Sequence, residues 1–377
     1  MQREKRKKGR AEKFKKRVKG EEGKRGKGKK RLDASSSSTA PSPVSSSSTA
    51  SSTAVSSSTA SSSSVSGSQR NQTTVSVIGA GRLGTALARA LASRGYAVEA
   101  VVARRLSHAQ RAARLISTQT LALSAKQLEK LPQSRLILIT TPDDMIAEAA
   151  ARLAATRPKL RQQSSHQNQQ PSRPTRIALH ASGALSSEIL SPLSRANFRT
   201  GSLHPLISVS DPTSGAESLR EAFFCIEGEA QAVRVARRIV SALGARSFAI
   251  KERDKALYHA AAVMASGHVT ALFDIATEML KACGLTKEKA RAVLLPLTRS
   301  ALENLSKREP ARALTGTFAR ADIATVRKHL AALKSSALRD ALAAYILLGQ
   351  RSLKLAKESG ADVELLKAIA ETLRDEK

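Results

Sequence analysis

Residues 74–84 read TVSVIGAGRLG, a short β-branched run followed by three glycines in the spacing G-x-G-x-x-G. This spacing follows a predicted strand and begins a predicted helix, which is the context that a dinucleotide-binding loop requires. Gly79 permits the tight turn, Gly81 lets the backbone approach a pyrophosphate, and Gly84 lets helix and strand pack closely. With Arg82 and Leu83 between the glycines, the loop predicts a cofactor-binding turn. The alternative is a strand–helix turn that merely needs glycine.

Strand-like and helix-like segments alternate from residue 74 to about residue 250. We predict strands at 74–78, 97–103, 135–140, 176–180, near 200–203, near 222–227 and at 246–250, separated by helices at about 82–95, 107–116, 143–155 and 229–243. Such alternation is typical of an α/β fold with a parallel sheet covered by helices, here of the Rossmann type.

The strand signal disappears after about residue 252, where Ala and Leu dominate with helical periodicity. We predict an all-α C-terminal part with helices near 252–283, 287–307, 322–334, 336–358 and 361–374, with breaks at Gly284, Pro310, Gly316 and Gly360. The predicted organisation is therefore a Rossmann-like domain over 71–250 and a helical domain over 251–377.

The first 70 residues differ in composition from the rest of the chain. Residues 1–33 carry 17 basic and 5 acidic residues, and residues 34–68 contain 20 Ser and 4 Thr. A segment this polar cannot bury a core, so we expect a disordered basic and Ser-rich tail. Residues 157–175, rich in Gln, Ser and Pro, are expected to form a solvated loop inserted into the Rossmann-like domain.

The net charge of +32 suggests a nucleic-acid partner, but 12 of these charges belong to residues 1–33. No helix-turn-helix or zinc-finger pattern is present, and aromatic residues are only 3% of the chain. Nucleic-acid binding through the tail is therefore the least favoured hypothesis. It predicts salt-dependent binding that is lost when residues 1–70 are deleted.

Several other classes of protein are disfavoured by composition. Two cysteines, Cys225 and Cys283, make a disulfide scaffold or a cysteine-based zinc site improbable, and no other ligand spacing predicts a metal. No apolar run reaches the roughly 18 residues that span a bilayer, and the N-terminus lacks a secretory signal. We expect a cytoplasmic protein in a reducing compartment that does not associate with membranes.

The second strand indicates which dinucleotide binds. An NAD site has an Asp or Glu about 20 residues after the glycine loop, whereas this strand ends at Arg104 and Arg105. A guanidinium pairs with a 2′-phosphate that a carboxylate would repel. The sequence therefore predicts NADP, with ordinary surface charge as the alternative reading of the two arginines. Glu99 is the nearest acid, and it lies too early in the strand.

Further polar residues follow the later strands, where the ligand crevice of an open α/β sheet is expected. Thr140, Thr141 and Pro142 end one strand and are predicted to contact the cofactor, with Asp143 as an N-cap. His180 and Ser182 follow the next strand, and Ser202 and His204 come later. Each histidine taken alone is more often structural than catalytic.

A third polar group lies on the predicted helix that begins near residue 252. At 100° per residue, Lys255, His259 and Ser266 fall within 40° of one another on an Ala-rich segment that we expect to be buried. A buried Lys or His has a lowered pKa, which suits proton donation. We therefore predict catalytic roles for Lys255, His259, His204 and Ser182 and a cofactor contact for His180. The alternative is an interdomain hydrogen-bonded seam.

The segments GAGRLG, TTPDDMI, HASGAL, GSLHPL, DKALYHAAAVMASG and LTGTFARADIATVRKHL occur in this order. The chain resembles the bacterial Rossmann-like proteins with a C-terminal helical domain of unknown function 2520, which are related to pyrroline-5-carboxylate reductase, prephenate dehydrogenase and 6-phosphogluconate dehydrogenase. The resemblance implies NADP-dependent oxidoreductase activity on a small-molecule substrate, bound where the Rossmann domain meets the helices. It also implies a homodimer through the C-terminal helices.

The chain departs from this family at two places. Ala265-Ser266-Gly267 stands where the family reads A-S-N, and Thr317 and Ala321 replace a Pro and a Gly in its L-T-G-P-x-x-R-G-D segment. The first hypothesis is an oxidoreductase acting on a small carbonyl, imine or hydroxy-acid metabolite. The second is an NADP-binding regulator or scaffold without turnover, which the lost Asn amide favours.

Overall fold

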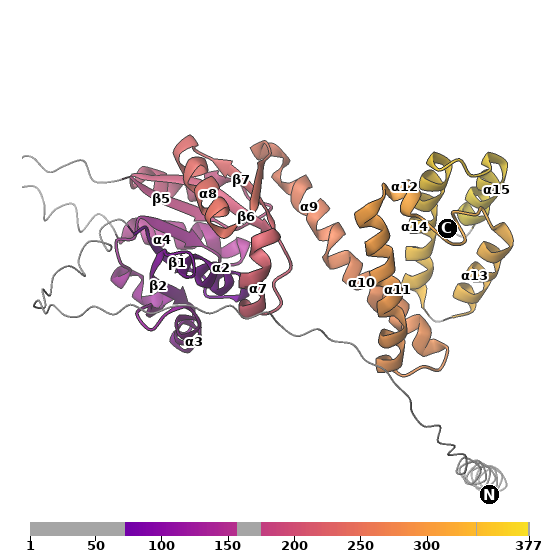
Figure 1. Cartoon of the computed structure of the whole chain (residues 1–377), viewed down its shortest axis with the longest axis horizontal. Coiled ribbons are helices and arrows are strands. Elements are labelled where there is room, and N and C mark those ends of the chain that lie inside the picture. The colour runs from indigo at the N-terminus through magenta and orange to yellow at the C-terminus, as the bar shows by residue number, and fades with distance from the viewer. Residues whose placement is uncertain (1–71, 157–174, 337, 376–377) are drawn as a thin grey trace, which may run out of the picture. The chain divides into compact units, whose positions relative to one another are not determined.

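The computed structural model describes residues 72–156, 175–336 and 338–375. Within them, an α/β part precedes an all-α part (Figure 1), which confirms the predicted fold class. The predicted tail and residues 157–174 of the predicted loop lie outside the described residues.

The α/β part is built on an eight-stranded sheet in the order β3-β2-β1-β4-β5-β6-β7-β8. Among the described strands, only β6 and β7 pair in an antiparallel manner. The strands are β1 Thr74–Ile78, β2 Ala97–Ala103, β3 Leu121–Ser124, β4 Leu136–Ile139, β5 Arg176–His180, β6 Phe198–Leu206, β7 Phe223–Gly228 and β8 Arg246–Ala249. Because chain order reverses between β1 and β4, the crevice for a ligand lies at their carboxyl ends.

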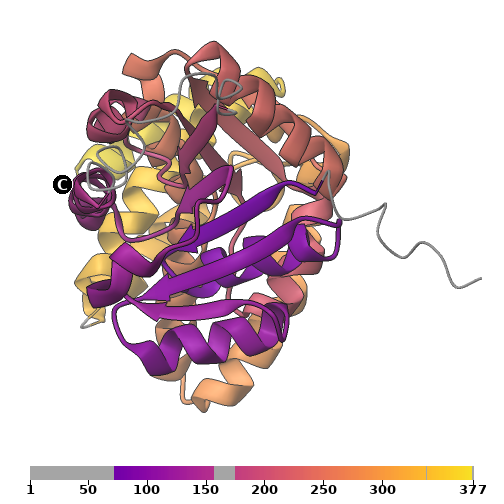
Figure 2. The same ribbon diagram turned by 90° about the vertical axis from the view of Figure 1, so that its left-hand side faces the viewer.

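Helices cover both faces of this sheet (Figure 2). They are α2 Arg82–Ala92, α3 Leu106–Ile116, α4 Ile146–Ala155, α6 Ser191–Arg195, α7 Pro212–Ser218 and α8 Ala230–Leu243. The sequence Leu-Ile-Leu-Ile of β4 explains why two layers are needed. Leu136 and Leu138 enter the core under α2, α3 and α8, whereas Ile137 and Ile139 enter the core under α4 and α6. Strands buried on both faces are expected in a parallel sheet.

The C-terminal part consists of helices joined by short turns. They are α9 Lys255–Ala265, α10 Gly267–Ala282, α11 Lys287–Lys307, α12 Pro310–Ala313, α13 Ile323–Ser335, α14 Arg339–Glu358 and α15 Val363–Arg374. The predicted breaks at Gly284, Gly316 and Gly360 coincide with turns, where each glycine has a positive φ of 83–92°. A small core joins α13, α14 and α15, and Asp322 caps α13 by accepting from Thr325 N–H.

The single helix predicted over 252–283 is wrong, because the chain breaks at Ser266. Its φ of −127° and ψ of −69° are not helical, and α10 starts afresh at Gly267. The prediction that this segment is buried is also wrong. Lys255 is buried at the start of α9, but most of α9, α10 and α11 is exposed, including Leu257 and Met264.

The exposed segment bears on the expected absence of a membrane span. In the part of the chain that the structure describes, the stretch 252–282 is long and apolar enough to cross a bilayer, because an 18-residue window within it has a mean hydropathy of 1.3. This is a criterion of length and composition alone. A single such stretch is weak evidence, because core helices satisfy the same criterion.

Candidate functional site

The glycine loop between β1 and α2 has the geometry that its spacing predicts. Gly79 has a φ of +112°, and a Cβ there would lie 2.5 Å from the carbonyl carbon of Thr140. A Cβ on Gly84 would lie 2.1 Å from the carbonyl oxygen of Gly79, so only glycine lets α2 approach β1 so closely. Gly81 differs, since a Cβ there would meet nothing within 4 Å. Its open side is where a phosphate could approach the backbone.

A cavity of about 400 Å³ opens beside this loop at the carboxyl ends of β1, β2 and β4. Its wall includes Gly79, Gly81, Arg104, Thr140, Thr141 and Pro142, together with His108, Asp144, Glu148 and Arg152. Six residues predicted to bind the cofactor therefore line one space. Arg82, Leu83, Gly84, Arg105 and His180 do not line it, although Gly84 shapes the loop and Arg105 is the N-cap of α3.

The residues around the cavity fit a phosphorylated dinucleotide. The first turn of α2 contains no acidic residue, and its N-cap Gly81 has no side chain to occupy the free N–H groups. The hydroxyl of Thr141 is buried without a hydrogen-bond partner, so a ligand could satisfy it. Glu99 does not approach Arg104, because its carboxylate accepts from Ser134 within the sheet. The acids on the α4 side include Glu148, which pairs with Arg152 at 3.4 Å.

His180 lies at the end of β5 with both ring nitrogens engaged. Nδ1 accepts from the Ser182 N–H at 3.1 Å, which leaves Nε2–H to donate to the Ser186 carbonyl at 3.1 Å. The side chain is 1% exposed, and burial, reinforced by the charge of Lys255, lowers its pKa to about 4. His180 is therefore a neutral imidazole that holds the 180–186 turn.

Ser182 organises the same turn and links it to the end of β4. Its Oγ donates to Asp143 Oδ2 at 2.8 Å and accepts from the N–H groups of Ala184 and Leu185. The prediction that Asp143 is a helix N-cap is wrong, because Pro142 occupies that position and the Asp143 carboxylate binds Ser182 instead.

Lys255 fixes the start of α9 to the sheet. Its ammonium group donates to the Ser182 carbonyl at 3.1 Å and to Ser202 Oγ at 2.8 Å, and the residue is 1% exposed. Ser202 in turn donates to Glu227 Oε2 at 3.3 Å. Burial lowers the pKa of Lys255, while the charges of Cys225, if ionised, and of Glu227 and Asp143 oppose this shift. Both serines that accept from the ammonium group, Ser182 and Ser202, also donate their hydroxyl to a carboxylate.

His204, Tyr258 and His259 form an aromatic cluster beside Lys255. His204 Nδ1 lies 2.6 Å from the Tyr258 hydroxyl, and its ring meets that of His259 edge to face at 5.3 Å between centroids. Burial, then the neighbouring His259 and Lys255, lowers the pKa of His204 to about 4. His259 Nδ1 is buried without a hydrogen-bond partner.

The structure thus brings His180, Ser182, His204, Lys255 and His259 together but separates Ser266 from them. Ser266 lies exposed at the helix break and donates to the Ala262 carbonyl. The sequence reasoning missed Tyr258, although its position three residues after Lys255 places it on the same side of α9. It also missed Glu227, which had no signal because its partners lie far away in the sequence.

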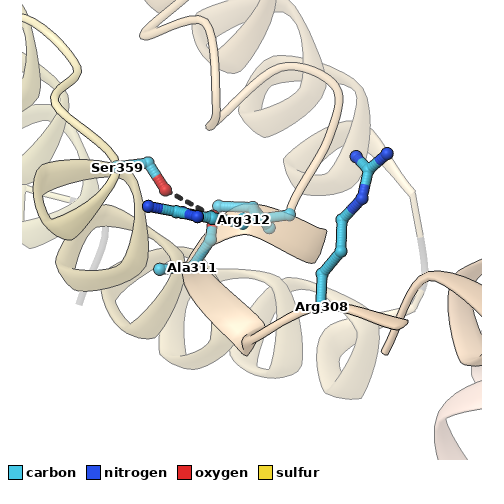
Figure 3. Close-up of a pocket in the computed structure, with 5 residues that line it drawn as sticks. Arg308, Ala311, Arg312 and Ser359 are labelled. Atoms are coloured by element: carbon cyan, nitrogen blue, oxygen red, sulfur yellow. Dashed lines mark hydrogen bonds between the residues drawn. The ribbon is translucent and has the colours of Figure 1, made fainter. Parts of the chain in front are cut away.

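A second hollow of about 500 Å³ lies in the C-terminal part (Figure 3). It is lined by Arg308, Ala311, Arg312, Leu314 and Ser359. The Arg308 side chain extends away from the side on which Arg312 and Ser359 lie. Two arginine side chains line this hollow, as Arg104 and Arg152 line the cavity at the sheet, but it has no glycine loop. Its arginines can therefore serve as controls for those at the sheet.

A doubly wound sheet with a glycine loop at its switch point, followed by helices, defines a Rossmann-like α/β protein with a helical C-terminal domain. Comparison with family models gives the same result. The chain combines a Rossmann-like domain, matched over residues 58–205, with the family described as Domain of unknown function (DUF2520), matched over residues 222–352. No curated protein matched the sequence significantly.

Solved structures are similar to this chain at low sequence identity. A Bacteroides fragilis protein that has been proposed to be an NADP oxidoreductase is 22% identical, with a TM-score of 0.58 over 74% of this chain and 98% of its own. A Thermotoga maritima protein is 20% identical, with a TM-score of 0.52 over 80% and 99%. A pyrroline-5-carboxylate reductase of Coxiella burnetii is 13% identical, with a TM-score of 0.46 over 81% and 99%.

The lowered pKa of His180 makes the folded state less stable in acid. The folded chain keeps His180 neutral down to about pH 4, whereas the unfolded chain protonates it near its ordinary value of 6.5. The unfolded state therefore binds more protons in this window, and the free energy of unfolding falls as the pH is lowered through it. We expect a shallower fall for His180→Asn in urea unfolding at several pH values. His108→Asn, at an exposed imidazole, is the control; equal slopes for both variants and the wild type would contradict this prediction.

Proposed function

We propose that the chain is an NADP(H)-dependent oxidoreductase acting on a small carbonyl, imine or hydroxy-acid metabolite. The observation that carries the proposal is the shared position of two features. The cavity at the glycine loop and the cluster around Lys255 both lie where β1, β4, β5 and β6 run toward the same edge of the sheet. A dinucleotide bound along this edge would extend from one feature toward the other.

The cofactor would be held by groups of different chemistry. Gly79 and Gly81, with the first turn of α2, would hold the pyrophosphate. The Thr141 hydroxyl, which has no partner in the protein, would form a hydrogen bond with the ligand. Arg104, exposed on the cavity wall, would pair with the 2′-phosphate, with Arg105 adding positive charge at the start of α3. When bound, the nicotinamide supplies or accepts a hydride.

The residues proposed for the substrate side are of two kinds: some face a bound ligand, and the others orient neighbouring residues. Half-buried His204 and His259 are the candidates to face the substrate. Ser182 and Lys255 have their hydrogen-bonding groups directed to protein partners, so we assign them to orienting the turn and α9. We therefore assign proton donation to the histidines and not to Lys255, for which the sequence had suggested it.

A regulator that binds NADP without turnover is the second candidate. It is favoured by Ser266-Gly267, because Ser266 is exposed at a helix break and adds no group to the cluster. The two candidates differ in one observation: the regulator binds NADPH but transfers no hydride to any metabolite, whereas the oxidoreductase oxidises NADPH or reduces NADP with some member of a metabolite panel.

Calorimetric titration of the full chain with NADPH and NADH tests cofactor choice. We expect the wild type to prefer NADPH, and Arg104→Ser to weaken NADPH binding about tenfold while NADH binding changes little, because one charge-assisted hydrogen bond contributes about 1.5–3 kcal/mol. Arg312→Ser, in the second hollow, is the matched control and should bind as the wild type does. A wild type that prefers NADH, or binds neither, contradicts the proposal.

We also propose that two copies of the chain associate through the C-terminal helices. Large apolar side chains are exposed along α9, α10 and α11, among them Leu257, Met264, Leu272, Val293, Leu297 and Leu302. An exposed apolar surface of this extent marks an interaction site. A second copy is favoured over a bilayer because Ser266 interrupts the long apolar stretch and α10 carries Asp274 and Glu278, which are costly in hydrocarbon.

The substitution Leu297→Glu tests this association. Leu297 is 68% exposed on α11, so the change should leave the fold intact by circular dichroism while converting a dimer to a monomer in light scattering at micromolar concentration. Leu121→Glu, at a side chain 44% exposed on β3, is the control and should remain dimeric. A monomeric wild type, or a dimeric Leu297→Glu variant, overturns the proposal.

A further inference from the structure

Two imidazole rings converge on a single glycine. A Cβ built on Gly183 would lie 2.3 Å from His259 Nδ1 and 2.9 Å from both Cε1 and Nε2 of His204. Gly183 is buried, so no side chain could turn away into solvent. The residue after Ser182 must therefore be glycine for both imidazoles to reach this position. Within the described residues, the hydrogen bond of His204 is made by Nδ1 with Tyr258, and Nε2 makes none.

The bond from Tyr258 determines which nitrogen of His204 carries the proton. Burial raises the pKa of Tyr258, so the phenol keeps its proton. The phenol oxygen lies 2.6 Å from His204 Nδ1. A phenol is the better donor of this pair and an imidazole nitrogen the better acceptor, so Tyr258 O–H donates to His204 Nδ1. A neutral His204 then has its proton on Nε2.

We propose that Tyr258 is a positioning residue that holds His204 as the Nε2–H tautomer, so that a neutral imidazole presents a hydrogen-bond donor beside Gly183. The inference deepens the proposed function and rests on it for the identity of the site. The group that matches a neutral N–H donor is an acceptor with a free lone pair. A carbonyl or hydroxyl oxygen qualifies, whereas a protonated imine or an ammonium has no lone pair to offer. A neutral imine nitrogen also keeps its lone pair, so the substrate class is narrowed to groups with a free lone pair, and protonated imines and ammonium groups are excluded.

The charges around His204 support a neutral donor. The ring of His259 meets it edge to face from α9, and the charge of Lys255 disfavours a positive charge on His204. Its pKa of about 4 leaves it uncharged throughout the physiological range. A neutral imidazole donates a hydrogen bond to a ligand but does not attract anions by its charge. It therefore favours a polar uncharged group over an anion.

The chain contains a matched control for this assignment. In the C-terminal part, His329 Nδ1 lies 2.8 Å from the Tyr345 hydroxyl, and the two rings meet edge to face with centroids 5.7 Å apart. The corresponding values for His204 and Tyr258 are 2.6 Å and 5.6 Å. Tyr345→Phe therefore removes the same kind of bond from a histidine outside the proposed site.

The tautomer is read by two-bond ¹H–¹⁵N correlation NMR of the full chain labelled at histidine, without cofactor or substrate. We expect His204 to show a protonated Nε2 and an unprotonated Nδ1, and Tyr258→Phe to give a mixture of tautomers while the ring contacts remain. Tyr345→Phe should change His329 and leave His204 as in the wild type. A wild-type His204 protonated on Nδ1, or one unchanged in Tyr258→Phe, overturns the assignment of Tyr258.

The ligand class is tested by titrating the NADP-loaded chain with 2-propanol and, separately, with isopropylammonium, which has the same size but no lone pair. We expect 2-propanol to shift the His204 Nε2–H resonance in the wild type, and at least about fivefold less in Tyr258→Phe, and isopropylammonium to leave it in place. A shift with both probes or with neither overturns the requirement for a lone pair. A chain that does not bind NADP refutes the proposed function, and the tautomer result is then judged alone.

Discussion

The buried ammonium group of Lys255 is the charge on which the polar end of the sheet depends. A cation taken out of water costs several kcal/mol unless it is well bonded, and here it donates to two oxygens, one in the turn after β5 and one in β6. Ser182 and Ser202 pass this contact on to Asp143 and Glu227, so four separate segments are held in register with the start of α9. The first turn of α9 can hardly shift without leaving the cation unpaired.

The position of Lys255 affects the hydrogen bonds and the protonation of the neighbouring histidines. His180 is sealed beneath the turn with both nitrogens occupied, whereas His204 and His259 stand at its edge with nitrogens that lack protein partners. The charge of Lys255 also disfavours protonation of His180 and His204. The same sheet edge carries the glycine loop, where close approach of Gly84 to Gly79 leaves the backbone at Gly81 open. The cavity and the polar cluster thus both lie at the carboxyl ends of parallel strands in one sheet.

Much of this arrangement could be predicted from sequence, because it is encoded locally. The β-branched runs of β1, β2 and β5 fixed their bounds to the residue, and the glycine spacing located the cavity. The strand β3 was missed because Leu-Ala-Leu-Ser is too short to show a period. The break at Ser266 was missed although Gly267 marks it, since the Ala-rich run on either side outweighed one glycine.

Other features depend on contacts between distant segments. Hydropathy indicated that α9 and α10 were buried, but it does not say which molecule covers them, and within one chain they are exposed. The role of Asp143 was assigned from its place after a strand, whereas its carboxylate accepts a hydrogen bond from Ser182, 39 residues later. Tyr258 could not be predicted as a site residue, because its hydrogen-bond partner His204 lies 54 residues earlier.

Hydrogen–deuterium exchange of the full chain with and without NADPH tests the central claim most directly. If the dinucleotide lies along the carboxyl edge of β1, β2 and β4, backbone amides at 79–86, 103–108 and 140–146 become protected, and those at 308–314 beside the second hollow do not. Protection confined to the C-terminal helices, or no protection at saturating NADPH, would contradict the account.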